Sequence, residues 1–211
     1  MKKNLIPLFL LLVLAGCYPN GPDYVEQLDL VVSNYNPDFD FAGKLTYSLP
    51  DKVIKITGEK IDDPDGNNLP DFIDQTTANL ILNQIRSNMN ARGYSEVDES
   101  GDPDLILLPS AMETTTLVYY YDWWYWGWYY PAYPGYGWGW YYPGYYPPTY
   151  SSYTTGTLFI AMTDPHGLTP DMNIPVEWVG ILNGLLNYGN TSTRISSGID
   201  QLFTQSPYIQ H

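Results

Sequence analysis

The segments GTLFIAMTD (residues 156–164) and VEWVGILNGLLNY (residues 176–188) decide the fold, because both carry the two-residue period of a β-strand. In the first segment, Leu158, Ile160 and Met162 share one face. In the second, the even-numbered positions are Val, Trp, Gly, Leu, Gly, Leu and Tyr. The two segments predict strands separated by a Pro- and Gly-rich turn region. The glycines of the second indicate a bulge or the close approach of a neighbour.

Two segments have the spacing of amphipathic helices. The first covers residues 76–92 and is followed by Gly93, a residue typical of a left-handed helix cap. Its apolar side chains fall on one face, namely Ala78, Ile81, Leu82, Ile85 and Met89. The second covers about residues 193–205 and ends before Pro207, with an inner stripe of Ile195, Ile199, Leu202 and Phe203.

The rest of the chain predicts further short strands, over residues 24–32, 44–49, 52–57, 94–97 and 104–108. The last of these is nearly all apolar and is therefore expected to be buried. Together the elements predict one α+β domain over residues 24–211. We expect an antiparallel sheet with two amphipathic helices packed on one face.

The N-terminus has the features of a lipoprotein leader. Lys2 and Lys3 precede an apolar run that is too short to span a bilayer. The run ends in Leu-Ala-Gly-Cys, which resembles a bacterial lipobox. Residues 1–16 are therefore a predicted signal peptide, Cys17 a lipid attachment site, and residues 17–23 a lipid-anchored tether. The alternative is a plain secretory peptide with an incidental cysteine.

Charge and cysteine content limit the class of protein further. Cys17 is the only cysteine, so no internal disulfide can form. Without Lys2 and Lys3, seven basic residues face 23 acidic ones, a net charge of 7 − 23 = −16. Such a chain repels nucleic acid. Tyr18, rather than Asp, follows the cysteine, which agrees with sorting to the outer membrane. The sequence does not indicate which membrane face the domain occupies.

Residues 119–153 form a long aromatic tract of low complexity. It contains 14 of the 21 tyrosines and six of the seven tryptophans, and Asp122 is its only charged residue. We expect a hairpin-like insertion between two strands. Its rings could complete the core of the domain, contact a protein, stack on a glycan or enter a lipid headgroup region. The predicted contact surface consists of Trp123, Trp124, Trp126, Trp128, Trp138 and Trp140.

An acidic loop before the first helix has the spacing of a calcium-binding loop. Oxygen-bearing side chains recur at EF-hand-like positions, namely Asp63, Asp65, Asn67, Asp71 and Asp74. Position 6 is Asn68 rather than Gly, position 8 is Pro70, and position 12 is the short Asp74. The alternative is an Asp-rich loop that only caps the helix.

The sequence predicts no catalytic residue. The two histidines lie in the turn DPHGLTPD, as His166, and at the final position, as His211. Neither position favours the rigid geometry that nucleophilic or metal catalysis requires. Asp102 and Asp104 flank Pro103, where they are expected to turn the chain before a buried strand. We therefore expect a protein that is not an enzyme and that requires no cofactor, calcium excepted.

The layout resembles the DUF4136 family of bacterial lipoproteins. The likeness rests on residues 38–49 (DFDFAGKLTYSL), Arg-Gly-Tyr at 92–94 and Asp-Pro-Asp-Leu-Ile at 102–106, together with the two strands quoted first and the closing helix. The resemblance implies an envelope lipoprotein without an assigned reaction. We expect a binding or structural protein of the cell envelope with a protein or glycan partner. The alternative is a glycan-binding or glycan-processing protein that uses the aromatic tract.

Overall fold

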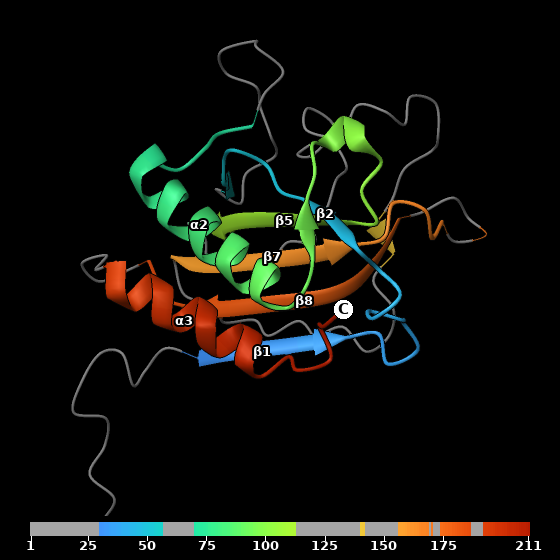
Figure 1. The fold of residues 1–211 in the computed structure, drawn as a ribbon. Coiled ribbons are helices and arrows are strands. Elements are labelled where there is room, and N and C mark those ends of the chain that lie inside the picture. The colour runs from blue at the N-terminus through green and yellow to red at the C-terminus, as the bar shows by residue number, and fades with distance from the viewer. Residues whose placement is uncertain are drawn as a thin grey trace, which may run out of the picture.

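The computed structural model describes residues 30–56, 70–112, 140–141, 156–168, 170, 174–186 and 192–211 (Figure 1). The predicted signal peptide, the predicted tether and almost all of the predicted insertion 119–153 lie outside these residues. The strands are β1 (Leu30–Tyr35), β2 (Thr46–Ser48), β3 (Ile54–Ile56), β4 (Ser95–Glu96), β5 (Leu105–Met112), β6 (Trp140–Tyr141), β7 (Thr157–Thr163) and β8 (Ile174–Asn183). The helices are α2 (Gln75–Ala91), the short η2 (Glu99–Gly101) and α3 (Ser192–Thr204).

The sheet is mixed, and its strand order is β1-β8-β7-β5-β2-β4, with β3 beside β5 and β6 beside β8. The α+β class is confirmed, but the prediction of an antiparallel sheet is wrong in part. The central pairs are antiparallel, whereas β2 pairs in parallel with both β4 and β5, β3 with β5, and β6 with β8. Helix α2 lies between β3 and β4, and such a helical crossover is what joins strands that run in the same direction.

Three strand ends differ clearly from the prediction, and the first is that of β5, which continues to Met112 instead of ending at residue 108. Strand β1 runs to Tyr35, into a segment whose Asn and Pro residues predict a turn, because its backbone pairs with β8 in register Val31↔Leu182 to Tyr35↔Trp178. Strand β8 ends at Asn183, although apolar alternation continues to residue 188. Gly184 has φ 74°, a left-handed conformation that starts a turn and ends the strand.

Helices α2 and α3 lie on the same side of the sheet (Figure 1), as predicted. The side chains that face these helices form the core, and they alternate along the central strands as Leu105 and Leu107, Leu158, Ile160 and Met162, and Trp178 and Leu182. The predicted apolar stripes of both helices are buried in this cluster. Gly93 has φ 94° and follows the end of α2, so its predicted role as a cap is confirmed.

The opposite face of the sheet is apolar as well. The alternate side chains of the central strands are Ile106 and Leu108 on β5, Phe159 and Ala161 on β7, and Val179 and Ile181 on β8, each at most 3 % exposed. They do not belong to the core cluster beneath the helices. In the described part of the chain, no helix lies on this second face (Figure 1). The sheet is therefore buried on both sides.

No helix within the described ranges is long and apolar enough to cross a bilayer.

Candidate functional site

Most residues of the predicted sites lie outside the part of the chain that the structure describes. These are the lipid attachment site Cys17, the loop residues Asp63, Asp65 and Asn67, and the tryptophans Trp123, Trp124, Trp126, Trp128 and Trp138. Asp71, Asp74 and the backbone of Trp140 are described. Among the described residues, no group of three or more His, Cys, Asp or Glu side chains is arranged to hold a metal ion.

Asp74 is the N-cap of α2. Its Oδ1 accepts a hydrogen bond of 2.9 Å from the backbone N–H of Thr77, and the pKa of its carboxyl is lowered chiefly by that bond. Asp71 is exposed, and its carbonyl oxygen accepts from the N–H of Lys55 at 2.8 Å. The described end of the acidic loop thus takes part in helix capping and backbone pairing.

Described residues lie on both sides of the aromatic tract, and two residues within it are described. Strand β5 ends at Met112, and the N–H of Gly156, just before β7, donates to the Met112 carbonyl at 2.7 Å. Strands β5 and β7 therefore flank the segment that contains the tract. Between these ends, β6 (Trp140–Tyr141) pairs in parallel with Ile174 and Pro175, at the start of β8. Because β8 runs antiparallel to β7, that start lies at the end of the sheet opposite Met112 and Gly156.

The same end of the sheet holds a polar cluster that the sequence analysis missed, in which Asp164 and Glu177 are buried and Asn36 and Lys44 are half-buried. Glu177 is only 4 % exposed, and its Oε2 accepts a hydrogen bond of 2.8 Å from Asn36 Nδ2. Asp164 is 6 % exposed and forms an ion pair of 2.9 Å with Lys44 Nζ. The only sequence signal was Glu177 itself, a charged residue in a strand that is otherwise apolar.

A β-bulge places Glu177 in this cluster. Along β8, Trp178 is paired with Met162, but the next pair is Val176 with Thr163, so Glu177 is an extra residue. Bulges redirect side chains and are common beside functional sites. The carboxyl of Glu177 has a raised pKa, first because burial disfavours its charged form and then because Asp164 is negative. Asn36 and Lys44 oppose that shift.

The turn after β7 borders the cluster and contains His166. The N–H of His166 donates to Asp164 Oδ1 at 2.8 Å. Its Nε2 lies 3.2 Å from the Pro103 carbonyl oxygen, a contact that requires a proton on Nε2. Asp102 Oδ1 is 3.5 Å from the same nitrogen. His166 is thus held in place, unlike the loose turn residue that the sequence indicates.

In the Asp-Pro-Asp motif, residues 102–104, the carboxylate of Asp104 has a structural role. One oxygen, Oδ2, accepts from the N–H of Leu45 at 2.9 Å, the N–H of Thr46 at 2.9 Å and the Thr46 hydroxyl at 3.0 Å. Burial alone would raise the pKa of Asp104, but these bonds outweigh it and the pKa is lowered. Asp104 therefore joins the start of β5 to β2, and this carboxylate is committed to the fold.

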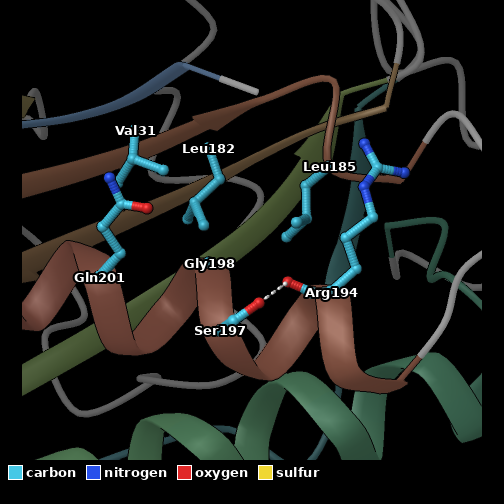
Figure 2. Close-up of a pocket in the computed structure, with 7 residues that line it drawn as sticks. All are labelled: Val31, Leu182, Leu185, Arg194, Ser197, Gly198 and Gln201. Atoms are coloured by element: carbon cyan, nitrogen blue, oxygen red, sulfur yellow. Dashed lines mark hydrogen bonds between the residues drawn. The ribbon is translucent and has the colours of Figure 1, made fainter. Parts of the chain in front are cut away.

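A small cavity of about 140 Å³ lies between α3 and the strands β1 and β8 (Figure 2). Val31, Leu182 and Leu185 form its apolar wall, and Arg194, Ser197 and Gln201 come from the helix. The Ser197 hydroxyl donates to the Thr193 and Arg194 carbonyls at 2.8 and 3.3 Å. The Ser197 hydroxyl therefore serves its own helix.

Among the described residues, this polar cluster is the best candidate for acid–base chemistry. A buried carboxyl with a raised pKa can hold or release a proton nearer neutral pH than a solvated one. Lys44 and Asp164 supply a fixed charge pair beside it. Glycoside hydrolysis needs two such carboxyl groups, although a buried ion-pair network also serves purely structural ends.

Comparisons with known proteins place this fold. The family model described as "Domain of unknown function (DUF4136)" matches residues 31–208. The chain is similar to a solved DUF4136 family protein from Bacteroides thetaiotaomicron, with 30 % identity and a TM-score of 0.63, over 86 % of this chain and 97 % of that one. It also matches a PelC dodecamer from Paraburkholderia phytofirmans at 9 % identity and a TM-score of 0.39, over 87 % and 99 % of the two chains.

The search of the curated proteins found no match. At its low score, the PelC likeness supports no inference about this chain. The family match covers most of the domain and agrees with the resemblance inferred from the sequence motifs. The chain belongs to the DUF4136 family.

Proposed function

We propose that this protein is a lipid-anchored component of the cell envelope, of binding or structural type, with the aromatic tract 119–153 as its contact surface. Cys17 carries the lipid after removal of residues 1–16, and the outer membrane is the expected destination. Two or more acyl chains anchor a protein durably where one does not. The tract offers Trp123, Trp124, Trp126, Trp128, Trp138 and Trp140 to a protein or glycan partner.

The observation that carries this proposal is the described support on either side of the tract. Met112 and Gly156 flank the segment that contains it, are joined by a hydrogen bond, and lie next to or in two strands that are buried along their whole length. Rigid strands are a good support for a recognition loop. In the described part of the chain, Leu45 is the only large apolar side chain that is exposed, at 52 %. The tract is therefore the main source of aromatic contact area in the chain.

Two variants of the full chain test the proposal. Cys17→Ala should move the protein from the membrane fraction to the soluble fraction of the envelope. Replacement of residues 119–153 by a short Asn-Gly turn should abolish its binding to isolated cell envelopes. Leu45→Ser is the matched surface control and should bind normally. If the shortened chain still binds, the tract is not the contact surface.

A second candidate function is glycan binding or processing. It is favoured by the position of β6, whose partners Ile174 and Pro175 immediately precede the strand segment that holds Glu177. An aromatic segment and a buried carboxyl cluster thus share one end of the sheet. An enzyme should lose turnover of envelope glycan in Glu177→Gln or Asp164→Asn. Equal turnover in these variants and the parent chain would exclude the cluster from any such reaction.

Calcium dependence is a separate proposal from the sequence of the acidic loop. The oxygens of Asp63, Asp65, Asn67, Asp71 and Asp74 would hold the ion, with Asp74 Oδ1 also capping α2. Calcium should raise the melting temperature of the parent chain, and Asp63→Ala with Asp65→Ala should abolish that rise. No rise in the parent chain refutes the site.

A further inference from the structure

We propose that strand β1 and helix α3 together bind an extended peptide segment of another protein. The segment adds a strand to the sheet beside β1 and places one apolar side chain in the cavity of Figure 2. This site is separate from the aromatic tract, and the inference does not depend on what the tract binds. Strand β1 supplies the backbone hydrogen bonds, and the cavity supplies the space for a side chain.

Strand β1 is an edge of the sheet. Among the described strands it comes first in the strand order, and its whole length pairs with β8 alone. The N–H of Asn36 donates to the Glu177 carbonyl at 2.8 Å, which fixes the residues whose backbone groups face β8. In an antiparallel ladder these residues alternate with ones that face away. The backbone groups of Val31 and Ser33 therefore point away from β8, toward the open side of the strand.

The edge lacks the features that usually prevent another strand from joining it. Natural edge strands carry a charge, a proline or a bulge for this purpose. Strand β1 has the sequence LVVSNY and a continuous register with β8, so it has none of the three. Residues 31–35 are all half-buried, whereas β5 and β7 are buried along their whole length. At Tyr35 the outward N–H already donates to Asn34 Oδ1 at 3.0 Å. The open part of the edge therefore ends at Ser33.

The cavity lies on the helix side of this edge. Its volume is about 140 Å³, and Val31, Leu182 and Leu185 form one wall while α3 forms the other (Figure 2). Val31 belongs to both parts of the site, because its side chain lines the cavity and its backbone groups point outward. A dry cavity of about 150 Å³ holds a benzene ring. The space therefore fits one side chain of the size of Leu, Ile or Phe.

The polar groups around the cavity favour an uncharged side chain. The Ser197 hydroxyl donates to carbonyls of its own helix, and Arg194 Nη2 donates to the Gly184 carbonyl at 3.4 Å. Gln201 is neutral and exposed. An apolar side chain gains free energy by leaving water for the apolar wall, whereas a carboxylate would lose its hydration there. In strand addition, backbone bonds supply affinity, and pockets of this kind select the side chain.

The size of the edge favours a short segment rather than a second copy of this chain. Val31 and Ser33 each offer one N–H and one C=O group, enough for about four backbone hydrogen bonds. A stable dimer buries about 800 Å² on each partner, over about 20–30 residues. An edge of six residues is roughly 20 Å long and does not supply that area. An extended segment of about five residues matches the length of the edge.

Amide exchange in the free chain gives the first test. The protein is the chain from residue 17 with Cys17→Ser, which keeps every described residue. The amides of Val31 and Ser33 should exchange at least about tenfold faster than those of Val32 and Asn34, which face β8. Slow exchange at Val31 and Ser33 would overturn the proposal, because the edge would then be paired already, by this chain or by a second copy.

A peptide series tests binding directly. The probes are capped pentapeptides Ser-Thr-X-Thr-Ser, in which X is Leu, Ile, Phe, Ala or Asp. Binding is followed by the NMR shifts of backbone amides in β1 and α3. At least one of the Leu, Ile and Phe peptides should bind about tenfold more tightly than the Ala and Asp peptides. Equal binding of the Asp peptide, shifts confined to other elements, or no binding at millimolar peptide would overturn the proposal.

Two variants connect this binding to the two parts of the site. Ser33→Pro removes an outward N–H and no bond to β8, an orientation in which edge strands tolerate proline. Ser197→Leu fills the cavity from α3. Each should weaken binding of the tightest peptide by about tenfold or more, whereas the matched controls Ser33→Thr and Ser197→Ala should stay within about twofold of the parent. Parent-like affinity in either Ser33→Pro or Ser197→Leu would overturn the proposal.

A change in the peptide replaces Ser33→Pro if that variant fails to fold by circular dichroism. N-methylation of the three central peptide residues removes the donors for the β1 carbonyls. The methylated peptide should bind the parent about tenfold more weakly or worse, and equal affinity would overturn strand addition. Residues 119–153 are unchanged throughout, so Ser33→Pro should bind isolated envelopes like the parent. Loss of both envelope and peptide binding in Ser33→Pro would support the groove and refute the tract as the contact surface.

Discussion

Gly180→Ala should destabilise the domain through a collision in the core. An alanine Cβ at this position would lie 2.7 Å from Trp178 Cη2 and 2.9 Å from Leu202 Cδ1, with Leu202 Cδ2 nearer still. Carbon atoms in good contact are about 3.5–4.0 Å apart. Neither neighbour has free space, since both side chains are 0 % exposed. The sheet approaches α3 this closely only because residue 180 lacks a side chain.

The magnitude follows from how well the neighbours can move. Overpacking a core typically costs about 1–3 kcal/mol. We expect a value near 3 kcal/mol, because the Trp178 indole is held by a hydrogen bond of 2.9 Å from Nε1 to Ser206 Oγ. The Ser206 hydroxyl in turn donates to the Leu202 carbonyl at 3.1 Å. The clash therefore has to be relieved by a shift of α3 itself.

Urea unfolding followed by circular dichroism measures this cost as a change in midpoint at constant m-value. Gly101→Ala is the matched control, since its Cβ would lie 3.4 Å from Val97 Cβ, an ordinary contact, and it should be near neutral. Leu202→Ala alone should cost about 2–5 kcal/mol. Added to Leu202→Ala, Gly180→Ala should cost less than it does alone, a coupling of about 1–3 kcal/mol, because only the contact with Trp178 remains. A Gly180→Ala midpoint equal to that of Gly101→Ala, or strict additivity in the double variant, would refute the reasoning.

Three further predictions concern the polar contacts. Asp104→Asn should lower the free energy of unfolding by about 1–2 kcal/mol near neutral pH, because three donors lose an ionised acceptor. Since the pKa of Asp104 is lowered, this contribution should be lost as the pH falls through the folded-state pKa, which urea unfolding at a series of pH values measures. Glu177 has a raised pKa, so the parent should lose stability as pH rises from the ordinary glutamate value through the folded-state pKa, whereas Glu177→Gln should not; parallel pH profiles would contradict this. Tyr94→Phe should cost about 0.5–1.5 kcal/mol in thermal unfolding, because the Phe41 carbonyl loses its 2.9 Å bond from Tyr94 and keeps only the 3.2 Å bond from the Lys44 N–H; an unchanged melting temperature would contradict this.

The sequence predicted the helices and the central strands well because their apolar residues recur with clear periods. Residues 76–92 and 193–205 differ from α2 and α3 by one residue at each end. Parallel pairing was missed because β2 and β4 have only three and two residues, too few to carry a pattern. Their direction is set by a helical crossover and by Asp104, a contact across 58 positions that no local pattern reveals.

The buried cluster could not be assembled from the sequence for a similar reason. Asn36 and Glu177 are 141 positions apart, and Lys44 and Asp164 are 120 apart. Each lies in a segment whose polar residues are typical of turns or strand ends. They meet because the end of β1, the end of β7 and the start of β8 lie at the same end of the sheet. The bulge at Glu177 leaves no recognisable pattern in the sequence.

The second face was visible in the sequence in one respect. In a strand that is buried on one side, apolar residues recur at every second position, and the even positions of β8 follow that pattern. Its odd positions, however, include Val179 and Ile181, and β7 has Phe159 and Ala161 at the corresponding places. A strand that is apolar at both its even and its odd positions needs to be covered on both faces. Helices α2 and α3 supply one cover, and no helix of the described residues lies on the other face (Figure 1).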